Sequence, residues 1–220
     1  MKWYIHVSLT ALIASALGFI ALSQPAAPQE EQLGIAPNGV NALEFISKID
    51  QVSSTATSYG YLTHIFDVPD DALFANPANP TEATARFTFS ATQTLDTPRL
   101  VANLIVHSAT GTVTFYFNQN PTGNFLNPSS FSSGQVIATY STRSHDVLNV
   151  QAPNQGITTT VSNLEQLTAN RFTLLGKQHQ LGRKGLLLRA EATGEATRTQ
   201  VTPLVSVTFS AGNVVITGQR

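Results

Sequence analysis

Tyr61, His64 and Asp67 lie within the segment YLTHIFD and form the most suggestive local group of reactive side chains in the chain. A carboxylate close to an imidazole orients the ring, so the pair can accept and release a proton or share a metal. The group therefore predicts a proton-transfer site of cyclase or isomerase type, provided that the three side chains converge. On a regular strand, however, their odd separation would place Tyr61 and His64 on opposite faces. His145 and Asp146 form a second candidate pair.

Asp67, Asp70 and Asp71 surround Pro69 and could hold calcium through their carboxylate oxygens. Their spacing matches no EF-hand loop. An alternative interpretation is that Asp70 and Asp71, which follow a proline, begin a one-turn helix over residues 72–74. The chain contains no cysteine and no His-Glu-x-x-His motif. We therefore expect no metal centre and no cofactor.

Arg189 ends the segment GRKGLLLR and shares a strand face with Leu187. If that face is the interior of the fold, Arg189 needs a carboxylate partner, for which Asp67 and Glu44 are the candidates. If the face is the exterior, the aliphatic stem of Arg189 covers Leu187, and we favour this second interpretation. The candidate polar site thus comprises Tyr61, His64, Asp67 and Arg189.

Other catalytic signatures are missing from the sequence. It contains no Gly-x-Ser-x-Gly motif for a nucleophile, and Gly182 and Gly185 are too close together for a phosphate-binding loop at the start of a helix. No two of the scattered glutamates stand out as a hydrolytic pair. The sequence therefore favours a protein that is not an enzyme.

Alternating hydrophobicity predicts the elements that position these side chains. In ATARFTFSATQ, alanine and phenylalanine occupy every second position, which is typical of a strand with one wet face. LVANLIVHS and GTVTFYFN are predicted to form a hairpin around Ala109-Thr110-Gly111, and a second turn is predicted at Ala211-Gly212-Asn213. The positions expected to point inward are Phe87, Phe89, Phe115, Phe117, Leu188 and Phe209.

About ten such strands at close spacing, without alternating helices, predict an all-β fold: an antiparallel β-barrel or β-sandwich. Asn-Pro pairs mark two long loops, at residues 67–82 and 119–133. If the strands close into a barrel, these loops would cover one rim.

The first 23 residues carry one lysine near the start, then an uncharged run, VSLTALIASALGFIAL, that ends before a Pro-rich stretch. This pattern predicts an export signal or, if it is not cleaved, an N-terminal apolar anchor helix. Residues 24–40 are predicted to be a flexible linker, and residues 41–220 a single all-β domain. The protein is therefore expected to be secreted or periplasmic, and membrane-attached only through the N-terminal segment.

Composition limits the partners. Charged residues make up 11% of the chain, and the formal net charge is −1, whereas an average protein has about 25% charged residues. Nucleic-acid binding needs a basic excess that is absent here, so we expect no nucleic-acid partner. The expected partner is a small apolar ligand or an envelope component, and the oligomeric state stays open.

Three stretches, TSYGYLTHIFDVPDDALF, EATARFTF and GRKGLLLRAEATGEATRT, resemble exported bacterial all-β proteins that have no assigned activity. The strand-rich layout is also similar, at the level of the fold, to barrels of the dirigent and allene-oxide-cyclase type. The resemblance implies export but transfers no catalytic residue. The leading hypothesis is a non-catalytic domain that binds a small apolar molecule or a cell-surface partner. The alternatives are a cyclase-like or isomerase-like enzyme at a barrel mouth, and a structural protein of the envelope or surface.

Overall fold

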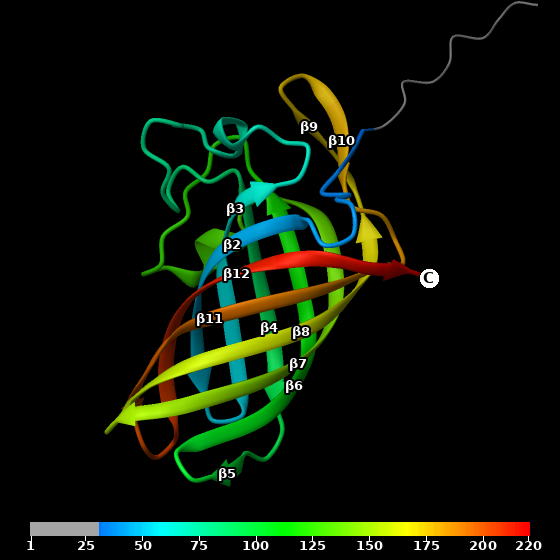
Figure 1. The fold of residues 1–220 in the computed structure, drawn as a ribbon. Helices are drawn as coiled ribbons and strands as arrows, with labels where there is room; N and C mark the ends of the chain where they lie inside the picture. Colours follow the sequence, from blue (N-terminus) through cyan, green and yellow to red (C-terminus); the bar gives the residue numbers. More distant parts are fainter. Residues whose placement is uncertain (1–30) are drawn as a thin grey trace, which may run out of the picture.

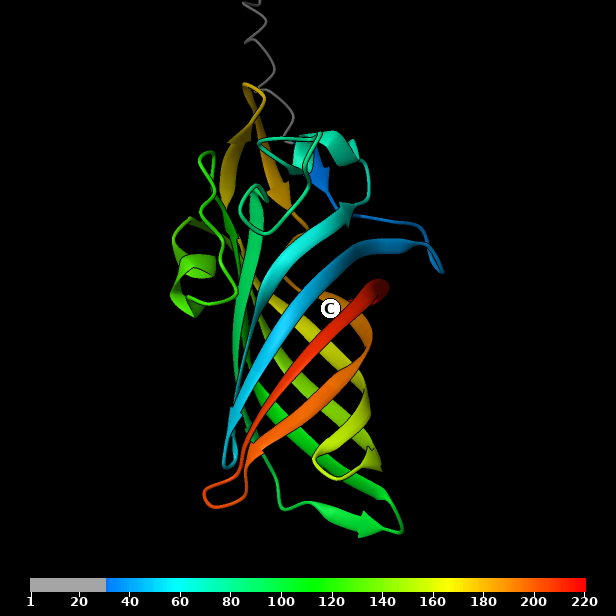
Figure 2. The same ribbon diagram turned by 90° about the vertical axis from the view of Figure 1, so that its left-hand side faces the viewer.

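The protein is a closed antiparallel β-barrel (Figures 1 and 2), as seen in a computed structural model that describes residues 31–220. Its eight strands are β2 (Asn41–Val52), β3 (Thr55–Ile65), β4 (Phe87–Leu95), β6 (Leu104–Phe117), β7 (Gln135–Ala152), β8 (Gln155–Ala169), β11 (Leu186–Gln200) and β12 (Val205–Gln219). Each strand pairs with the next one around the barrel, and β12 pairs with β2 to close it. The predicted antiparallel barrel is confirmed, and the sandwich alternative is not adopted.

Shorter elements decorate the two ends of the barrel. A small sheet of β1 (Glu31–Leu33), β10 (Lys177–Leu181) and β9 (Arg171–Leu174) stands at the upper end in Figure 1. At the lower end, β5 (Arg99–Val101) pairs with the start of β6. Two 3-10 turns, η1 (Asp70–Leu73) and η2 (Pro128–Ser132), lie in the long loops. The turn η1 begins after Pro69 with two acidic residues, where the sequence predicts a short helix.

The predicted linker is only partly covered by the described residues. Its last ten residues include β1, which pairs in parallel with β10, and Leu33 and Ala36 are buried. These apolar side chains fix the segment against the barrel because burying them removes their surface from water. The predicted signal or anchor at residues 1–23 lies outside the described residues. Between residues 31 and 220, no helix is long and apolar enough to span a membrane.

The two turns predicted at Gly111 and Gly212 are wrong, because β6 and β12 run through these positions without interruption. Both glycines instead permit close approach between neighbouring strands. A Cβ atom on Gly111 would lie 2.0 Å from the carbonyl oxygen of Thr92, and one on Gly212 would lie 2.3 Å from that of Glu191.

An aromatic plug closes the upper end of the barrel. The rings of Phe87, Phe117 and Phe172 contact one another with centroid distances of 5.0–5.6 Å, and all three are buried. Next to them, the buried Gln166 side chain donates to the carbonyl oxygen of Leu181 at 2.7 Å and accepts from the backbone N–H of Arg183 at 3.0 Å. The amide thereby ties the β10–β11 connection across this end.

The two long loops pack against the outer wall of β3 and β4, next to the same end. Thr88, on the outer face of β4, donates to the carbonyl oxygen of Phe131 at 2.7 Å. Under the loops lies a second aromatic cluster, formed by Tyr59, Tyr61, Phe74, Phe125 and Phe131. The long loops were expected to cover one rim, and their contacts place them against the outer wall next to that end.

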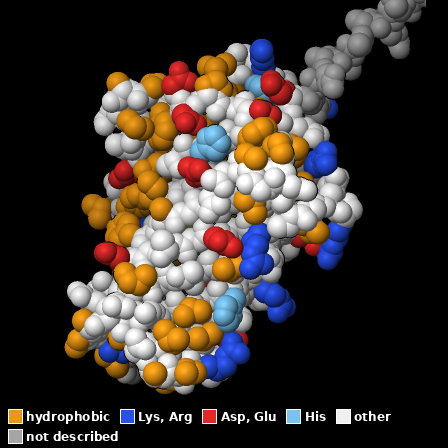
Figure 3. Space-filling model, viewed as in Figure 1, with side chains coloured by type: hydrophobic (Ala, Val, Ile, Leu, Met, Phe, Trp, Pro, Cys, Tyr) orange, Lys and Arg blue, Asp and Glu red, His pale blue; other side chains and the backbone are white. Residues whose placement is uncertain are grey.

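The outer surface combines polar and hydrophobic side chains. On the face shown in Figure 3, hydrophobic side chains gather in several patches among polar atoms. Phe209, predicted to point inward, is 52% exposed and contacts Phe125 on the outer wall. Its neighbours Thr208 and Ser210 face the interior instead. Here the hydrophobic side chain takes the outer face because the loop carrying Phe125 covers part of it.

Tyr140, inside the barrel, makes stability depend on pH in the alkaline range. Burial raises the pKa of its phenol above the ordinary value of 10.0. The folded state therefore holds this proton more tightly than the unfolded state, and the resulting stability is present below about pH 10 and is lost as pH rises above it. We expect Tyr140→Phe to flatten the fall in unfolding free energy between pH 9 and pH 11, as measured by urea titration. An unchanged slope would show that other groups control the alkaline transition.

Candidate ligand-binding cavity

The lower half of the barrel encloses a cavity of about 800 Å³. It ends at the lower end of the barrel in Figure 1, where its walls include Ser53, Asp96, Pro98, Asn154 and Leu204 from the turns and loops that join the strands. This volume lies within the range of about 300–1,000 Å³ found for small-molecule pockets. The aromatic plug closes one end, so we define the opposite end as the mouth of the cavity.

Aromatic rings form the floor of the cavity, which is its closed end, opposite the mouth. Phe89 lies between Phe45 and Phe115, with ring centroids 5.7 Å and 5.6 Å away, respectively. Val113, Leu164 and Val214 also line the cavity. The inward direction of Phe89 and Phe115 confirms the alternation predicted for these strands. A ligand that reaches the floor would exchange water for apolar contacts there.

His107 and Asp146 form an acid–base pair in the cavity wall. They are directly opposite each other on β6 and β7, and His107 Nε2 lies 3.7 Å from Asp146 Oδ2. The side chains are only 18% and 16% exposed, respectively. Asp146 also accepts hydrogen bonds from Thr160 at 2.5 Å and from Ser144 at 3.0 Å. These two bonds hold the carboxylate in place, and the carboxylate faces the imidazole.

Gln93 extends the polar group around this pair. Its side-chain amide donates to Ser144 Oγ at 3.3 Å. Gln93 is paired with Gly111 in the β4–β6 register, and a Cβ atom on that glycine would lie 2.9 Å from Gln93 Cγ. The absence of a side chain at Gly111 therefore lets the Gln93 side chain pass over β6 toward β7.

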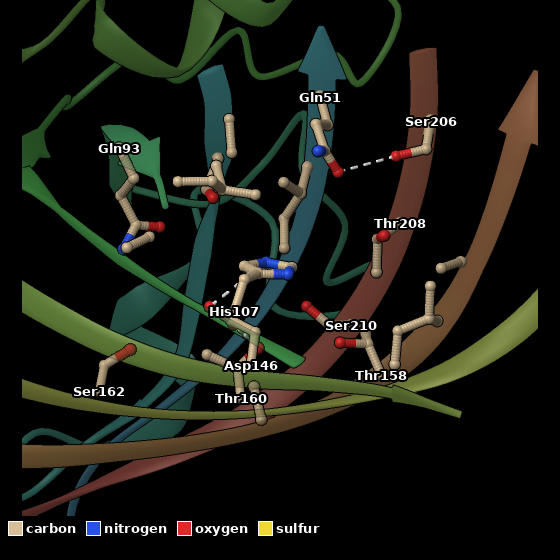
Figure 4. A pocket seen from close by; sticks show the side chains of 18 of the residues that line it. Gln51, Gln93, His107, Asp146, Thr158, Thr160, Ser162, Ser206, Thr208 and Ser210 are labelled. Carbon is tan, nitrogen blue, oxygen red and sulfur yellow. Dashed lines mark hydrogen bonds and ion pairs between the residues drawn. The ribbon is translucent and has the colours of Figure 1, made fainter. Parts of the chain in front are cut away.

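Hydroxyl groups line a further part of the cavity (Figure 4). β8 contributes three of them and β12 another three: Thr158, Thr160, Ser162, Ser206, Thr208 and Ser210. Ser210 shares a hydrogen bond of 2.7 Å with Ser47, and Ser206 donates to Gln51 Oε1 at 3.2 Å. The interior is thus amphipathic, with an aromatic floor and a hydroxyl-rich wall.

The four residues of the sequence-predicted polar site lie outside this cavity. Tyr61 is buried in the outer aromatic cluster, and Arg189 is on the outer face, near Glu191 and Asn163. The exterior interpretation of Arg189 therefore agrees with the structure. Asp67 is exposed, with a φ of 66°, and belongs to a small pocket beside β10.

Tyr61 and His64 lie on the same outer face of β3, contrary to the expectation for a regular strand. The pairing between β2 and β3 shifts at this point, and both Leu62 and Ile65 are fully buried. A bulge of this kind re-aims the residues that follow it. His64 Nδ1 lies 3.0 Å from Asp70 Oδ1, so this histidine does pair with a carboxylate, although not with Asp67.

Asp67, Asp70 and Asp71 do not form a metal site in the structure. Across residues 31–220, no three histidine or acidic side chains are arranged to hold a metal ion. Asp70 engages His64 and also begins η1.

The partner of Asp146 differs from the one that its sequence neighbours predict. The predicted pair was His145 and Asp146, but adjacent strand residues point to opposite faces, and His145 is exposed. The actual partner, His107, comes from the neighbouring strand. The signal for it was the position of His107 in a strand, two residues before the inward-facing Ala109.

Comparison with known proteins gives no match: no family model, no curated protein and no solved structure is similar to this chain.

Proposed function

We propose that the protein is an exported β-barrel that binds a small, largely apolar molecule in its cavity. The observation that carries this proposal is the cavity of about 800 Å³ with a floor of Phe45, Phe89 and Phe115. A solid core would fill this space with side chains, as the aromatic plug does at the other end. Export is supported by the signal-like N-terminal sequence and by the resemblance to exported bacterial all-β proteins.

Filling the cavity should abolish binding. Ala192 lines the cavity from β11. We expect Ala192→Phe to weaken binding of the uncharged apolar dye N-phenyl-1-naphthylamine by about tenfold or more, because the new ring takes up the space of the ligand. The measurement is a fluorescence titration of the protein as it is isolated from its host.

Thr193→Phe is the matched control, because Thr193 is the next residue on β11 and is exposed on the outer face. It adds the same ring and should leave dye binding unchanged. Equal dye binding by the wild type and both variants would refute the cavity as the binding site. Native mass spectrometry of the protein isolated from its host would reveal a retained ligand, whereas a ladder of oligomers without ligand would favour the structural alternative.

A second candidate function, proton-transfer catalysis, is favoured by one observation, the His107–Asp146 pair in the cavity wall. In an isomerisation, His107 would remove a proton from a carbon beside a carbonyl group and return it to another carbon, so that no co-reactant is consumed. In D₂O, such an enzyme would introduce deuterium into the retained ligand, and His107→Gln would stop this exchange while leaving binding intact. A ligand that gains no deuterium would restrict the protein to binding.

A further inference from the structure

The wall formed by β8, β11 and β12 has a regular chemical pattern. The middle strand, β11, presents Ala190, Ala192 and Ala196 to the cavity. In the sheet register, Ala192 pairs with Thr160 of β8, and Ala196 pairs with Thr208 of β12. The small side chains of β11 thus form a shallow furrow with hydroxyl groups along both sides. Because the flanking strands are two strand spacings apart, the two rows of hydroxyls are separated by about 10 Å.

The opposite wall is mostly apolar. In the strand order around the barrel, β4 lies across from β11, and β6 lies across from β12. These two strands contribute Ala91, Leu95 and Val113 to the wall, and the rings of Phe89 and Phe115 lie where this wall meets the floor. The polar exceptions on this wall are Gln93 and His107, and both interact with the side chains of β7. The cavity therefore has two chemically different faces.

Two largely buried threonines of the cavity carry hydroxyl groups that have no hydrogen-bond partner in the described chain. Thr208 is 9% exposed and Thr142 is 7% exposed, and both line the cavity. Within the described chain, neither side chain forms a hydrogen bond, whereas the neighbouring Ser210 and Ser144 do. Figure 4 shows Thr208 directed into the cavity from β12. An entirely apolar ligand would remove water from these hydroxyls without replacing the lost hydrogen bonds, and this would weaken its binding.

We propose that the ligand is a rigid, facially amphipathic molecule, with an apolar face toward β4 and β6 and a face of hydroxyl or carbonyl oxygens toward β8, β11 and β12. This inference rests on the proposed function, because it specifies the ligand of the same cavity. A rigid polycyclic skeleton fits the furrow, since the alanines of β11 allow it to approach the sheet closely. Its oxygens then meet Thr208 and the hydroxyls of β8 at the sides of the furrow.

A matched pair of probes tests the facial pattern. Methyl cholate carries three hydroxyl groups on one face of a steroid skeleton, and methyl cholanate has the same skeleton without them. Each is titrated against the protein as isolated with N-phenyl-1-naphthylamine bound, and the dissociation constant is obtained from the displacement of the dye. We expect the wild-type protein to bind methyl cholate about tenfold more tightly, which corresponds to one or two hydrogen bonds.

Thr208→Val removes the unpartnered hydroxyl and keeps the shape of the side chain. We expect this variant to lose most of the preference for methyl cholate through weaker binding of that probe, with binding of methyl cholanate unchanged or improved. Thr158→Val, on the other side of the furrow, is a second variant with the same expected direction. Thr159→Val makes the same change on the exposed face of β8 and should retain the wild-type preference. The melting temperature of each variant identifies any loss of folding.

The possible failures are distinguishable. If the dye binds in the cavity, as shown by its loss in Ala192→Phe, but the two steroids bind equally, the facial inference is wrong and the proposed function stands. If Thr208→Val and Thr158→Val both keep the full preference for methyl cholate, the two rows of hydroxyls do not bind the oxygens of the ligand. The inference is then also overturned. If the dye binding is insensitive to Ala192→Phe, the proposed function itself fails.

Discussion

Phe87→Ala is expected to lower the free energy of unfolding by about 3–5 kcal/mol, the usual cost of truncating a buried phenylalanine. Phe87 is fully buried, and its ring contacts Phe117 and Phe172 at centroid distances of 5.2 Å and 5.6 Å. Removing the ring leaves a void in the plug, and the surrounding strands cannot close it because their hydrogen bonds fix their spacing. The measurement is a denaturant titration monitored by circular dichroism.

Phe209→Ala is the matched control for this experiment. Phe209 is 52% exposed on the outer wall, so we expect its loss to cost less than about 1 kcal/mol. A cost for Phe87→Ala as small as that for Phe209→Ala would show that the plug is not a rigid core. Such a plug would also leave the upper end of the barrel open to the cavity.

The strand pattern and the fold class could be predicted because alternation is a local property of the sequence. In β4, Phe87, Phe89 and Ala91 face inward as the period of two requires. The choice between a barrel and a sandwich could not be made in this way. It depends on the pairing of β12 with β2 and of β4 with β6, which are contacts between distant segments.

Glycine has two different structural uses in this chain. Gly111 and Gly212 lie between two apolar runs, a pattern that predicts turns, whereas both lie in the middle of long strands. A strand that is surrounded by close neighbours in a barrel also needs glycine at particular positions. The two uses of glycine look the same in a single sequence, and only the pairing of the strands separates them.

The candidate site illustrates the same limit. Tyr61, His64 and Asp67 are neighbours in the sequence, yet they lie outside the cavity. The polar pair inside it, His107 and Asp146, comes from two strands and is brought together by the register of β6 with β7. The strand period could exclude His145 as a partner for Asp146, but it could not identify His107, because the register is not visible in the sequence.

Gly111→Ala is expected to destabilise the barrel by about 3 kcal/mol or more, at the upper end of the usual cost of overpacking. The added Cβ would lie 2.0 Å from the carbonyl oxygen of Thr92 and 2.8 Å from Gln93 Cα. Both are backbone atoms of β4, so no side-chain rotation relieves the clash, and β4 must move away from β6. The movement also breaks the contact of Gln93 with Ser144, which helps to position the wall around Asp146.

Gly218→Ala provides the comparison, because it makes the same substitution in another strand of the barrel. The nearest atom to its added Cβ is Leu187 Cδ1 at 3.7 Å, an ordinary contact. We expect a change in unfolding free energy within about 0.5 kcal/mol for this variant.

Both variants are measured by urea titration, and binding of N-phenyl-1-naphthylamine is measured on the folded fraction. Equal stabilities of the two variants would mean that β4 and β6 are not held as closely as the barrel requires. The close approach of β4 and β6 at this point is the reason why the strand needs glycine at position 111.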